Sequence, residues 1–141
     1  MEQIKKTSCG ILFIFDNKVL LCHSTGSAWR GSSSIYIPPK GGIEENETQE
    51  ECASREAIEE VGITILPSRL KNCRVIKISG AKENYLFVLK LNSLSEIGLK
   101  DLVLPKLKLQ LKEIDYAKFY TKEEASKLLR GNWVKILDEL K

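Results

Sequence analysis

The sequence predicts an α+β fold in which helices pack on a mixed β-sheet. Strand-like apolar segments occur before and after a capped amphipathic helix in the middle of the chain, and the last twenty residues have a helical pattern. With 141 residues, 43% hydrophobic and 29% charged, the chain can bury a core without disulfides or a structural metal. We therefore expect a single domain over residues 1–141.

The first third of the chain is expected to form a hairpin and a short third strand. Residues 7–15 are an apolar run rich in β-formers, residues 16–18 (Asp-Asn-Lys) favour a turn, and residues 19–22 form a second strand. Residues 24–34 are rich in Gly and Ser and are typical of a surface loop. A short strand at 35–37 is stopped by two prolines.

A helix over residues 49–61 is expected next, because Thr48 and Glu51 form a capping box and Gly62 is a natural stop. Strands are then predicted at 74–79, 85–91 and 116–120. The leucines of residues 93–112 are ambiguous, although alternation over 106–112 favours a strand. A second capping box at Thr121 predicts a helix to Arg130, and residues 132–140 suggest another.

The sequence indicates a cytoplasmic protein. Its longest apolar run is strand-sized, and residues 1–7 lack the apolar segment of a signal peptide, so we expect no membrane partner. The cysteines are widely spaced and contain no C-x-x-C pair, which argues against a zinc site or a disulfide framework. We expect free, largely buried thiols at Cys9, Cys22, Cys52 and Cys73.

The net charge of +3 conceals two opposed regions. Residues 44–60 contain eight of the nineteen acidic residues and one base, Arg55, which leaves a net charge of +10 elsewhere. An acidic block within a basic protein suggests a cation site surrounded by a surface that attracts anions, although a solvated helix face is the simpler alternative on charge alone.

Three carboxylates of the predicted helix share one face. At about 100° per residue, Glu56, Glu59 and Glu60 fall within a sector about 100° wide. The stripe expected to meet the core holds Ala53, Ala57, Ile58 and Val61. Clustered carboxylates without histidine or thiolate ligands suit Mg²⁺ or Mn²⁺, and Mg²⁺ commonly completes its shell with substrate phosphates. Phosphate chemistry is the expected consequence.

Residues 41–63, GGIEENETQEECASREAIEEVGI, resemble the Nudix box G-x5-E-x7-R-E-U-x-E-E-x-G-U, where U is a bulky aliphatic residue. One position departs from the pattern, because Ala57 is smaller than the usual aliphatic residue. The resemblance implies a Nudix (MutT-like) hydrolase, with a mixed sheet sandwiched by helices in an α/β/α arrangement. The matching fixed positions are Gly41, Glu47, Arg55, Glu56, Glu59, Glu60 and Gly62.

The resemblance also implies roles for these residues. Glu56, Glu59 and Glu60 would hold Mg²⁺, with Mn²⁺ as a possible substitute, helped by a backbone carbonyl at Gly41 or its neighbour Lys40. Glu47 would pair with Arg55 and so orient Glu56. Either Glu56 or Glu60 would take the proton of the attacking water. Glu113, in a segment similar to one ahead of the family's last strand, is the candidate for an additional glutamate, against an ordinary strand-edge charge.

Substrate-binding candidates lie close to the box. Lys40 and Arg30 are candidates for phosphate contacts. Trp29 and Tyr36 are candidates for stacking on a base, although either ring could instead cover the sheet. His23 and Tyr85 are interpreted as structural residues.

The leading functional hypothesis is a Mg²⁺-dependent pyrophosphohydrolase. It would cleave a small nucleoside diphosphate linked to another group, such as a nucleotide or a dinucleoside polyphosphate, by direct attack of water on phosphorus. One alternative acts on the 5′-triphosphate of RNA, which the basic remainder of the chain would attract. Another is a non-catalytic Nudix-like module that binds nucleotides. DNA is not an expected partner.

Overall fold

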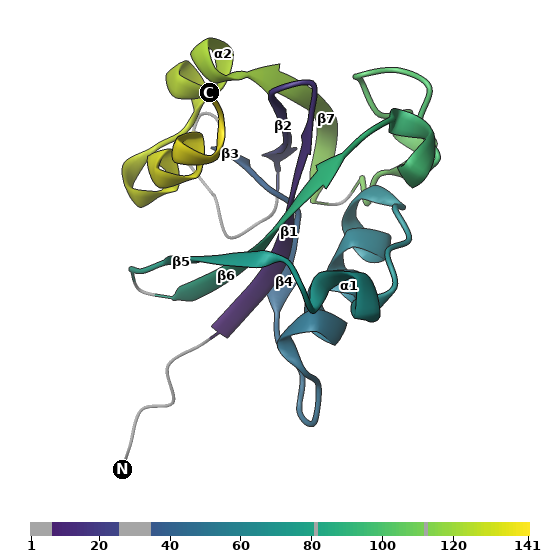
Figure 1. Cartoon of the computed structure of the whole chain (residues 1–141), viewed down its shortest axis with the longest axis vertical. Coiled ribbons are helices and arrows are strands. Elements are labelled where there is room, and N and C mark those ends of the chain that lie inside the picture. Colours follow the sequence, from purple (N-terminus) through teal and green to yellow (C-terminus); the bar gives the residue numbers. More distant parts are fainter. Residues whose placement is uncertain (1–6, 26–34, 81, 112) are drawn as a thin grey trace.

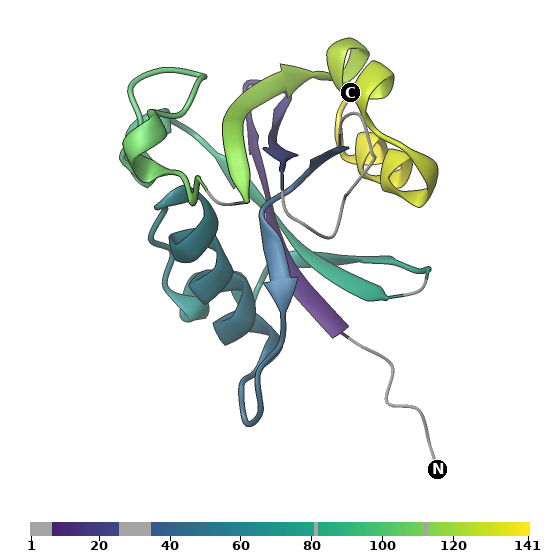
Figure 2. The ribbon, with the colours of Figure 1, turned by 180° about the vertical axis from the view of Figure 1, so that it is seen from behind.

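The computed structural model describes residues 7–25, 35–80, 82–111 and 113–141. Its sheet lies between two groups of helices (Figures 1 and 2). The strands of the described residues are β1 (Thr7–Phe15), β2 (Lys18–Ser24), β3 (Ile35–Ile37), β4 (Lys40–Gly42), β5 (Arg74–Ile78), β6 (Glu83–Leu91) and β7 (Ile114–Thr121). The helices are α1 (Gln49–Val61) and α2 (Lys122–Leu128), with the 3-10 helices η2 (Pro67–Leu70), η3 (Leu94–Ile97), η4 (Lys106–Lys108) and η5 (Gly131–Glu139).

The predicted hairpin is present, but its two strands are paired only near the turn. Asp16 and Asn17 both have positive φ, 51° and 57°, which is the geometry of a tight two-residue hairpin turn. β1 and β2 pair only next to this turn, at Ile14–Val19 and Phe15–Lys18. Farther from the turn each strand takes a different partner, so the two strands diverge.

The chain segment of β3 and β4 fills the space between the diverging strands. β3 pairs with the end of β2 and β4 pairs with the start of β1, both antiparallel. β4 was not predicted, because its residues carry no strand pattern and are held by long-range pairing. Gly10 of β1 is required at this crossing, since a Cβ there would overlap the Pro39 carbonyl and the Lys40 side chain.

The sheet is mixed, as predicted. β1 runs parallel to β6 along its whole length, and the remaining pairs are antiparallel, with β5 on β6 and β7 on β2. β7 begins at residue 114, two residues before the predicted start. This extension brings the residues just before β7 to the far end of β2, where Thr25 donates its backbone N–H to the Glu113 carbonyl.

Helices cover both faces of the sheet. Ile11 and Phe13 of β1 belong to the core beneath α1, whereas Leu12 and Ile14 belong to a second core that includes Ala125 of α2 and residues of η5. Alternate residues of one strand thus enter two separate cores. This is the α/β/α sandwich that the resemblance implied.

The capped helix α1 forms over the predicted residues. Thr48 accepts the Glu51 backbone N–H and Glu51 accepts the Thr48 N–H, while Gly62 ends the helix at φ 64°. The predicted core stripe is correct except at Ile58, whose side chain is 48% exposed. Ile58 lies at the edge of the stripe, beyond the ridge through which Ala53, Ala57 and Val61 meet the sheet.

The prediction of a strand over 106–112 is wrong. The described part of this segment contains the 3-10 helix η4 followed by a turn, with Leu107 fully exposed and Leu109 buried. The backbone N–H of Gln110 donates to the Glu60 carbonyl (3.0 Å), which ties the segment to the end of α1. The C-terminal helices are closer to their predictions. α2 ends at Leu128 instead of Arg130, and residues 131–139 form a 3-10 helix rather than an α-helix.

The four cysteines are free, as expected, and Cys9, Cys22 and Cys52 are buried. Over the residues that the structure describes, no helix is long and apolar enough to cross a membrane.

Candidate active site

Strand β4 lies against the middle of α1. The Cα of Gly41 lies directly against the Glu56 carboxylate, so that a side chain at this position would overlap it. The Gly41 carbonyl accepts the Cys52 thiol (3.5 Å), and the Gly42 carbonyl accepts Nη2 of Arg55 (3.0 Å). Backbone groups of β4 and side chains of α1 therefore form one continuous set of contacts.

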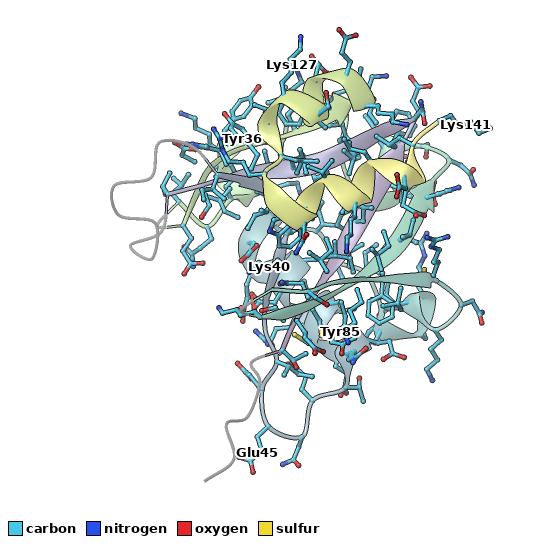
Figure 3. The ribbon with its side chains drawn as sticks, turned by 90° about the vertical axis from the view of Figure 1, so that its left-hand side faces the viewer. Tyr36, Lys40, Glu45, Tyr85, Lys127 and Lys141 are labelled. Carbon is cyan, nitrogen blue, oxygen red and sulfur yellow. The ribbon has the colours of Figure 1, made fainter. Side chains whose placement is uncertain are left out.

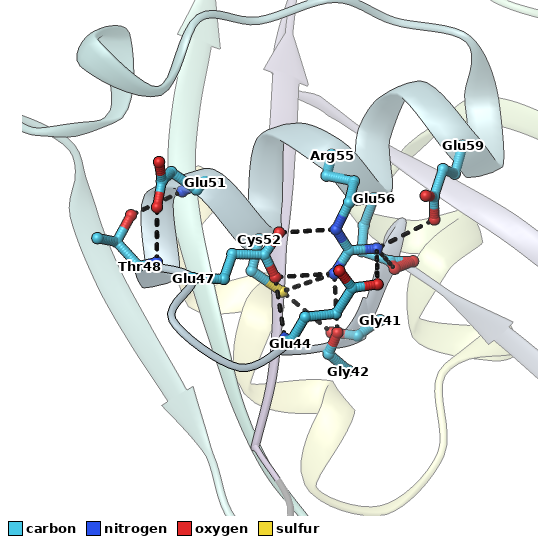
Figure 4. Close-up of polar contacts among 10 residues, drawn as sticks. All are labelled: Gly41, Gly42, Glu44, Glu47, Thr48, Glu51, Cys52, Arg55, Glu56 and Glu59. Atoms are coloured by element: carbon cyan, nitrogen blue, oxygen red, sulfur yellow. Dashed lines mark hydrogen bonds and ion pairs between the residues drawn. The ribbon is translucent and has the colours of Figure 1, made fainter.

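Arg55 is the centre of this set (Figure 4). Its Nε and Nη2 donate to the two carboxylate oxygens of Glu47 at 2.7 and 2.9 Å, a bidentate pair. Its Nη1 donates to Glu56 (3.0 Å) and to Glu59 (3.1 Å). One guanidinium thus fixes three carboxylates, and the predicted contact between Glu47 and Arg55 is present together with the predicted link to Glu56.

The contact with Arg55 lowers the pKa of Glu47 from 4.5 to about 2. Because the folded-state pKa is depressed, this carboxylate stabilises the fold fully above about pH 4.5, and the stabilisation is lost as the pH falls towards 2. We expect the Glu47→Gln variant to be less stable than the parent by about 2 kcal/mol at pH 7, with the difference shrinking below pH 4.5. Urea unfolding at several pH values from 3 to 7 measures this, and a difference independent of pH would contradict it.

A cavity of about 560 Å³ opens beside α1. Glu56, Glu59 and Glu60 line it, together with Glu113 from the turn before β7. Glu113 follows the helix carboxylates by more than fifty residues in the chain. The Gln110–Glu60 backbone hydrogen bond described above holds the two segments together. The structure therefore brings the additional predicted glutamate into the same cavity as the three carboxylates of the helix.

The electrostatics of the cavity disfavour several simultaneous negative charges. Burial, reinforced by Glu56, raises the pKa of Glu60 to about 8, although Glu60 accepts the Lys40 backbone N–H (3.0 Å). Burial also raises the pKa of Glu56, with Arg55 opposing the shift and Glu59 adding to it. A divalent cation would relieve this repulsion and displace the proton on Glu60.

The donor set fits a hard divalent ion, but the side chains are not gathered around one point. No group of three His, Cys, Asp or Glu side chains in the described ranges stands ready to hold a metal ion. The cause is visible in the contacts, since Glu56 and Glu59 turn towards Arg55 whereas Glu60 turns towards Lys40. Carboxylate oxygens on one helix face are nevertheless the ligands that Mg²⁺ or Mn²⁺ prefers.

Two lysines stand at the edge of the acidic cavity. Lys40, a predicted substrate contact, lines it, and so does Lys82 from the turn between β5 and β6. Burial, with the nearby charge of Lys82, lowers the pKa of Lys40. Lys82 was missed by the sequence analysis, because it belongs to no motif and only the pairing of β6 with β1 brings its turn here.

A second cavity, of about 490 Å³, adjoins the first and shares Ile37, Lys40 and Lys82 with it. Tyr36, labelled with Lys40 in Figure 3, lines this second cavity, as does Trp133 of η5. The Tyr36 ring is supported by His23, with ring centroids 4.9 Å apart. Tyr36 is therefore placed beside the acidic cavity rather than within it.

The remaining predicted residues fall into two groups. His23 is paired with Asp115 (2.5 Å), and Tyr85 is half-buried with its hydroxyl donating to Glu83 (2.6 Å), so both have structural contacts. Trp29 and Arg30 lie outside the described residues.

Comparison with known proteins decides the family. The model of the NUDIX domain matches residues 5–137. The chain belongs to the Nudix family. It is therefore an enzyme of the Nudix hydrolase type, a class that acts on nucleotide pyrophosphate bonds with the help of divalent metals.

Solved structures of Nudix proteins share the fold. A Caenorhabditis elegans Ap4A hydrolase, in a binary complex, is 18% identical with a TM-score of 0.66, covering 95% of this chain and 93% of that one. A NUDIX hydrolase from Nitrosomonas europaea is 18% identical with a TM-score of 0.67, covering 96% and 87%. A MutT protein from Methanosarcina mazei Go1 is 16% identical with a TM-score of 0.66, covering 99% and 94%. No curated protein sequence matches the chain.

The glycine pair of the Nudix box offers a matched test of the site. We expect Gly41→Ala to lower turnover about tenfold or more, because the new methyl group displaces the Glu56 carboxylate from Arg55. Gly42→Ala is the control, since a Cβ there meets nothing within 4 Å. Steady-state rates and thermal unfolding of both variants measure the effect. Equal rates for the two variants would show that the position of Glu56 does not matter.

Proposed function

We propose that this Nudix protein is a Mg²⁺-dependent pyrophosphohydrolase acting on a nucleoside diphosphate linked to another moiety, such as a nucleotide or a dinucleoside polyphosphate. The observation that carries the proposal is the meeting of two unlike cavities at a pair of lysines. Carboxylates line one cavity and aromatic and aliphatic side chains line the other. A nucleotide has the same two parts, a polyphosphate and a base, joined through phosphates that lysines can bind.

The residues of the acidic cavity suit the bound ion and the reaction. Glu56, Glu59 and Glu60 would hold Mg²⁺, with Mn²⁺ as a substitute, and the Gly41 carbonyl would add an oxygen. When bound, the ion would neutralise phosphate charge and activate the attacking water. Arg55 keeps Glu56 in place, and the ionised form of Glu56 or Glu60 accepts the proton of the attacking water. Glu113 would act as a further carboxylate facing the same space.

The two lysines would bind the phosphates where the two cavities meet. Lys40 loses part of its hydration in the cavity, and a phosphate oxygen would replace that hydration with a charge-assisted hydrogen bond. No covalent nucleophile is needed, so water attacks phosphorus directly. The Ap4A hydrolase among the structural neighbours supports dinucleoside polyphosphates as one class of substrate to test. The free thiols fit the reducing cytoplasm that we propose as its location.

A substrate panel tests the proposal. Nucleoside di- and triphosphates, dinucleoside polyphosphates, nucleotide sugars and 5′-triphosphorylated RNA are each incubated with Mg²⁺ or with EDTA, and the phosphate-containing products are identified. We expect cleavage of at least one small nucleotide with Mg²⁺ and a rate in EDTA lower by about 10³-fold or more. Cleavage restricted to RNA would overturn the small-nucleotide assignment, and metal-independent cleavage would overturn the mechanism.

A separate test follows the oxygen atom of the attacking water into the products. In H₂¹⁸O the label is expected in one of the two phosphate-bearing products, since water attacks phosphorus. Label in a non-phosphate product would contradict attack at that atom.

A further inference from the structure

The second cavity is lined by a buried side-chain amide whose oxygen is unpaired among the described residues. Asn84, near the start of β6, is 8% exposed and lines the cavity together with Tyr36 and Trp133. Its Oδ1 is buried, and within the described ranges it has no hydrogen-bond partner. Buried polar atoms in folded proteins are nearly always paired, so an unpaired acceptor beside a cavity points to a donor that arrives with a ligand.

The orientation of this amide is set by its neighbours. Nδ2 of Asn84 donates to the Lys82 carbonyl (3.5 Å). Turning the amide over would place Oδ1 against that carbonyl, with two acceptors facing each other. The backbone cannot move the residue either, because Asn84 pairs with Ser8 of β1 on one side and with Ile78 of β5 on the other. Asn84 therefore presents an acceptor rather than a donor.

Asn84 lies close to the proposed phosphate-binding lysines. Lys82, whose carbonyl holds the amide, is also one of the lysines at the junction of the two cavities. A nucleotide whose phosphates lie at that junction would place its base in the cavity lined by Tyr36, Trp133 and Asn84. Aromatic rings suit the faces of a base, and the acceptor suits an N–H on its edge.

We propose that Asn84 determines base specificity, by accepting at Oδ1 a hydrogen bond from the exocyclic amino group of the substrate's base, adenine in the first instance. Hypoxanthine, which carries a carbonyl where adenine carries the amino group, is disfavoured because two acceptors would meet. A site built around a hydrogen bond rejects the analogue that lacks the donor, since its buried group then stays unpaired. This inference rests on the proposed nucleotide substrate.

Equilibrium binding of ADP and IDP in EDTA tests the proposal without turnover. Calorimetric titration of the parent protein is expected to give ADP a Kd about tenfold or more below that of IDP. Asn84→Leu removes the acceptor at similar volume and is expected to bring the ratio close to one. Asn92→Leu is the matched control, because Asn92 is exposed and lines neither cavity, and it is expected to keep the parent ratio.

A second variant covers the case in which leucine disturbs the fold. Asn84→Asp keeps an acceptor at the same place, and it is expected to retain the preference for ADP while losing the bond to the Lys82 carbonyl. Circular dichroism and thermal unfolding accompany each titration. A purely structural role for Asn84 would change the unfolding temperature and leave the ADP/IDP ratio unchanged.

The outcomes separate this inference from the proposed function. Equal binding of ADP and IDP by the parent, binding of neither, or a preference that survives in Asn84→Leu overturns the role of Asn84. If the substrate panel shows cleavage while the binding ratio fails, only Asn84 is wrongly assigned. If the panel shows no cleavage of any nucleotide while the ADP preference depends on Asn84, the base site stands and the proposed reaction falls.

Discussion

Replacing Glu60 by glutamine is expected to lower turnover by about 10²-fold or more while the protein stays folded. Glu60 is the proposed metal ligand whose carboxylate is most strongly affected by burial, with a pKa of about 8. At neutral pH without a cation it is mostly protonated, and glutamine resembles that neutral form. Its amide oxygen can still accept the Lys40 backbone N–H. The loss therefore falls on ion binding and proton transfer rather than on folding.

Initial rates with saturating Mg²⁺ and thermal unfolding with and without Mg²⁺ measure this result. The parent protein is expected to unfold at a higher temperature when Mg²⁺ is present, and Glu60→Gln is expected to lose most of that shift. Glu45→Gln is a suitable control, because Glu45 is exposed and does not line the acidic cavity (labelled in Figure 3). A near-normal rate for Glu60→Gln would show that the metal ligands are assigned wrongly.

Arg55→Ala is expected to reduce both turnover and stability. Without the guanidinium, the carboxylates of Glu47 and Glu56 stay largely buried but lose the cation that they share. Removing one partner of a buried ion pair costs about 3 kcal/mol, so we expect a loss of this order in the free energy of unfolding. Turnover is expected to fall about 10²-fold because Glu56 leaves its position, whereas Mg²⁺ binding largely persists.

Comparing Arg55→Ala with Arg55→Lys separates positioning from charge. Lysine keeps the charge but cannot make the bidentate contact with Glu47, so we expect partial recovery of stability and little recovery of kcat. Arg69→Ala is the control, since its ion pair with Glu96 lies on the surface and contributes little to stability. Full recovery of kcat with lysine would mean that charge alone places Glu56. Loss of the folded state in Arg55→Ala would make the Glu47–Arg55 contact mainly structural.

Local signals in the sequence were sufficient for α1 and for the side chains that share its faces. The capping box at Thr48, the stop at Gly62 and the common face of Glu56, Glu59 and Glu60 depend on residues close together in the chain. The turn at Asp16 and Asn17 was predictable for the same reason. Such features are decided by spacing and backbone preference, both of which can be read from a single sequence.

Features that depend on distant partners were not predictable. Residues 40–42 become a strand because β1 offers unpaired backbone groups where it has left β2. Leu107 and Leu109 suggested one face of a strand, yet one is exposed and the other buried, because the segment is shaped by its attachment to Glu60. Lys82 and Asn84 reach the site through sheet pairing, which leaves no local pattern.

The divergence of β1 and β2 separates two tasks in space. Cleavage is assigned to the side of the sheet that carries α1, and base recognition to the side that carries η5, with β3 and β4 passing between them. The two halves of the site can therefore change independently. We expect exchange of residues 79–84 and 130–133 between related proteins to transfer base preference while the metal requirement stays the same. The opened hairpin thus offers one route by which a fixed hydrolytic centre could acquire new substrates.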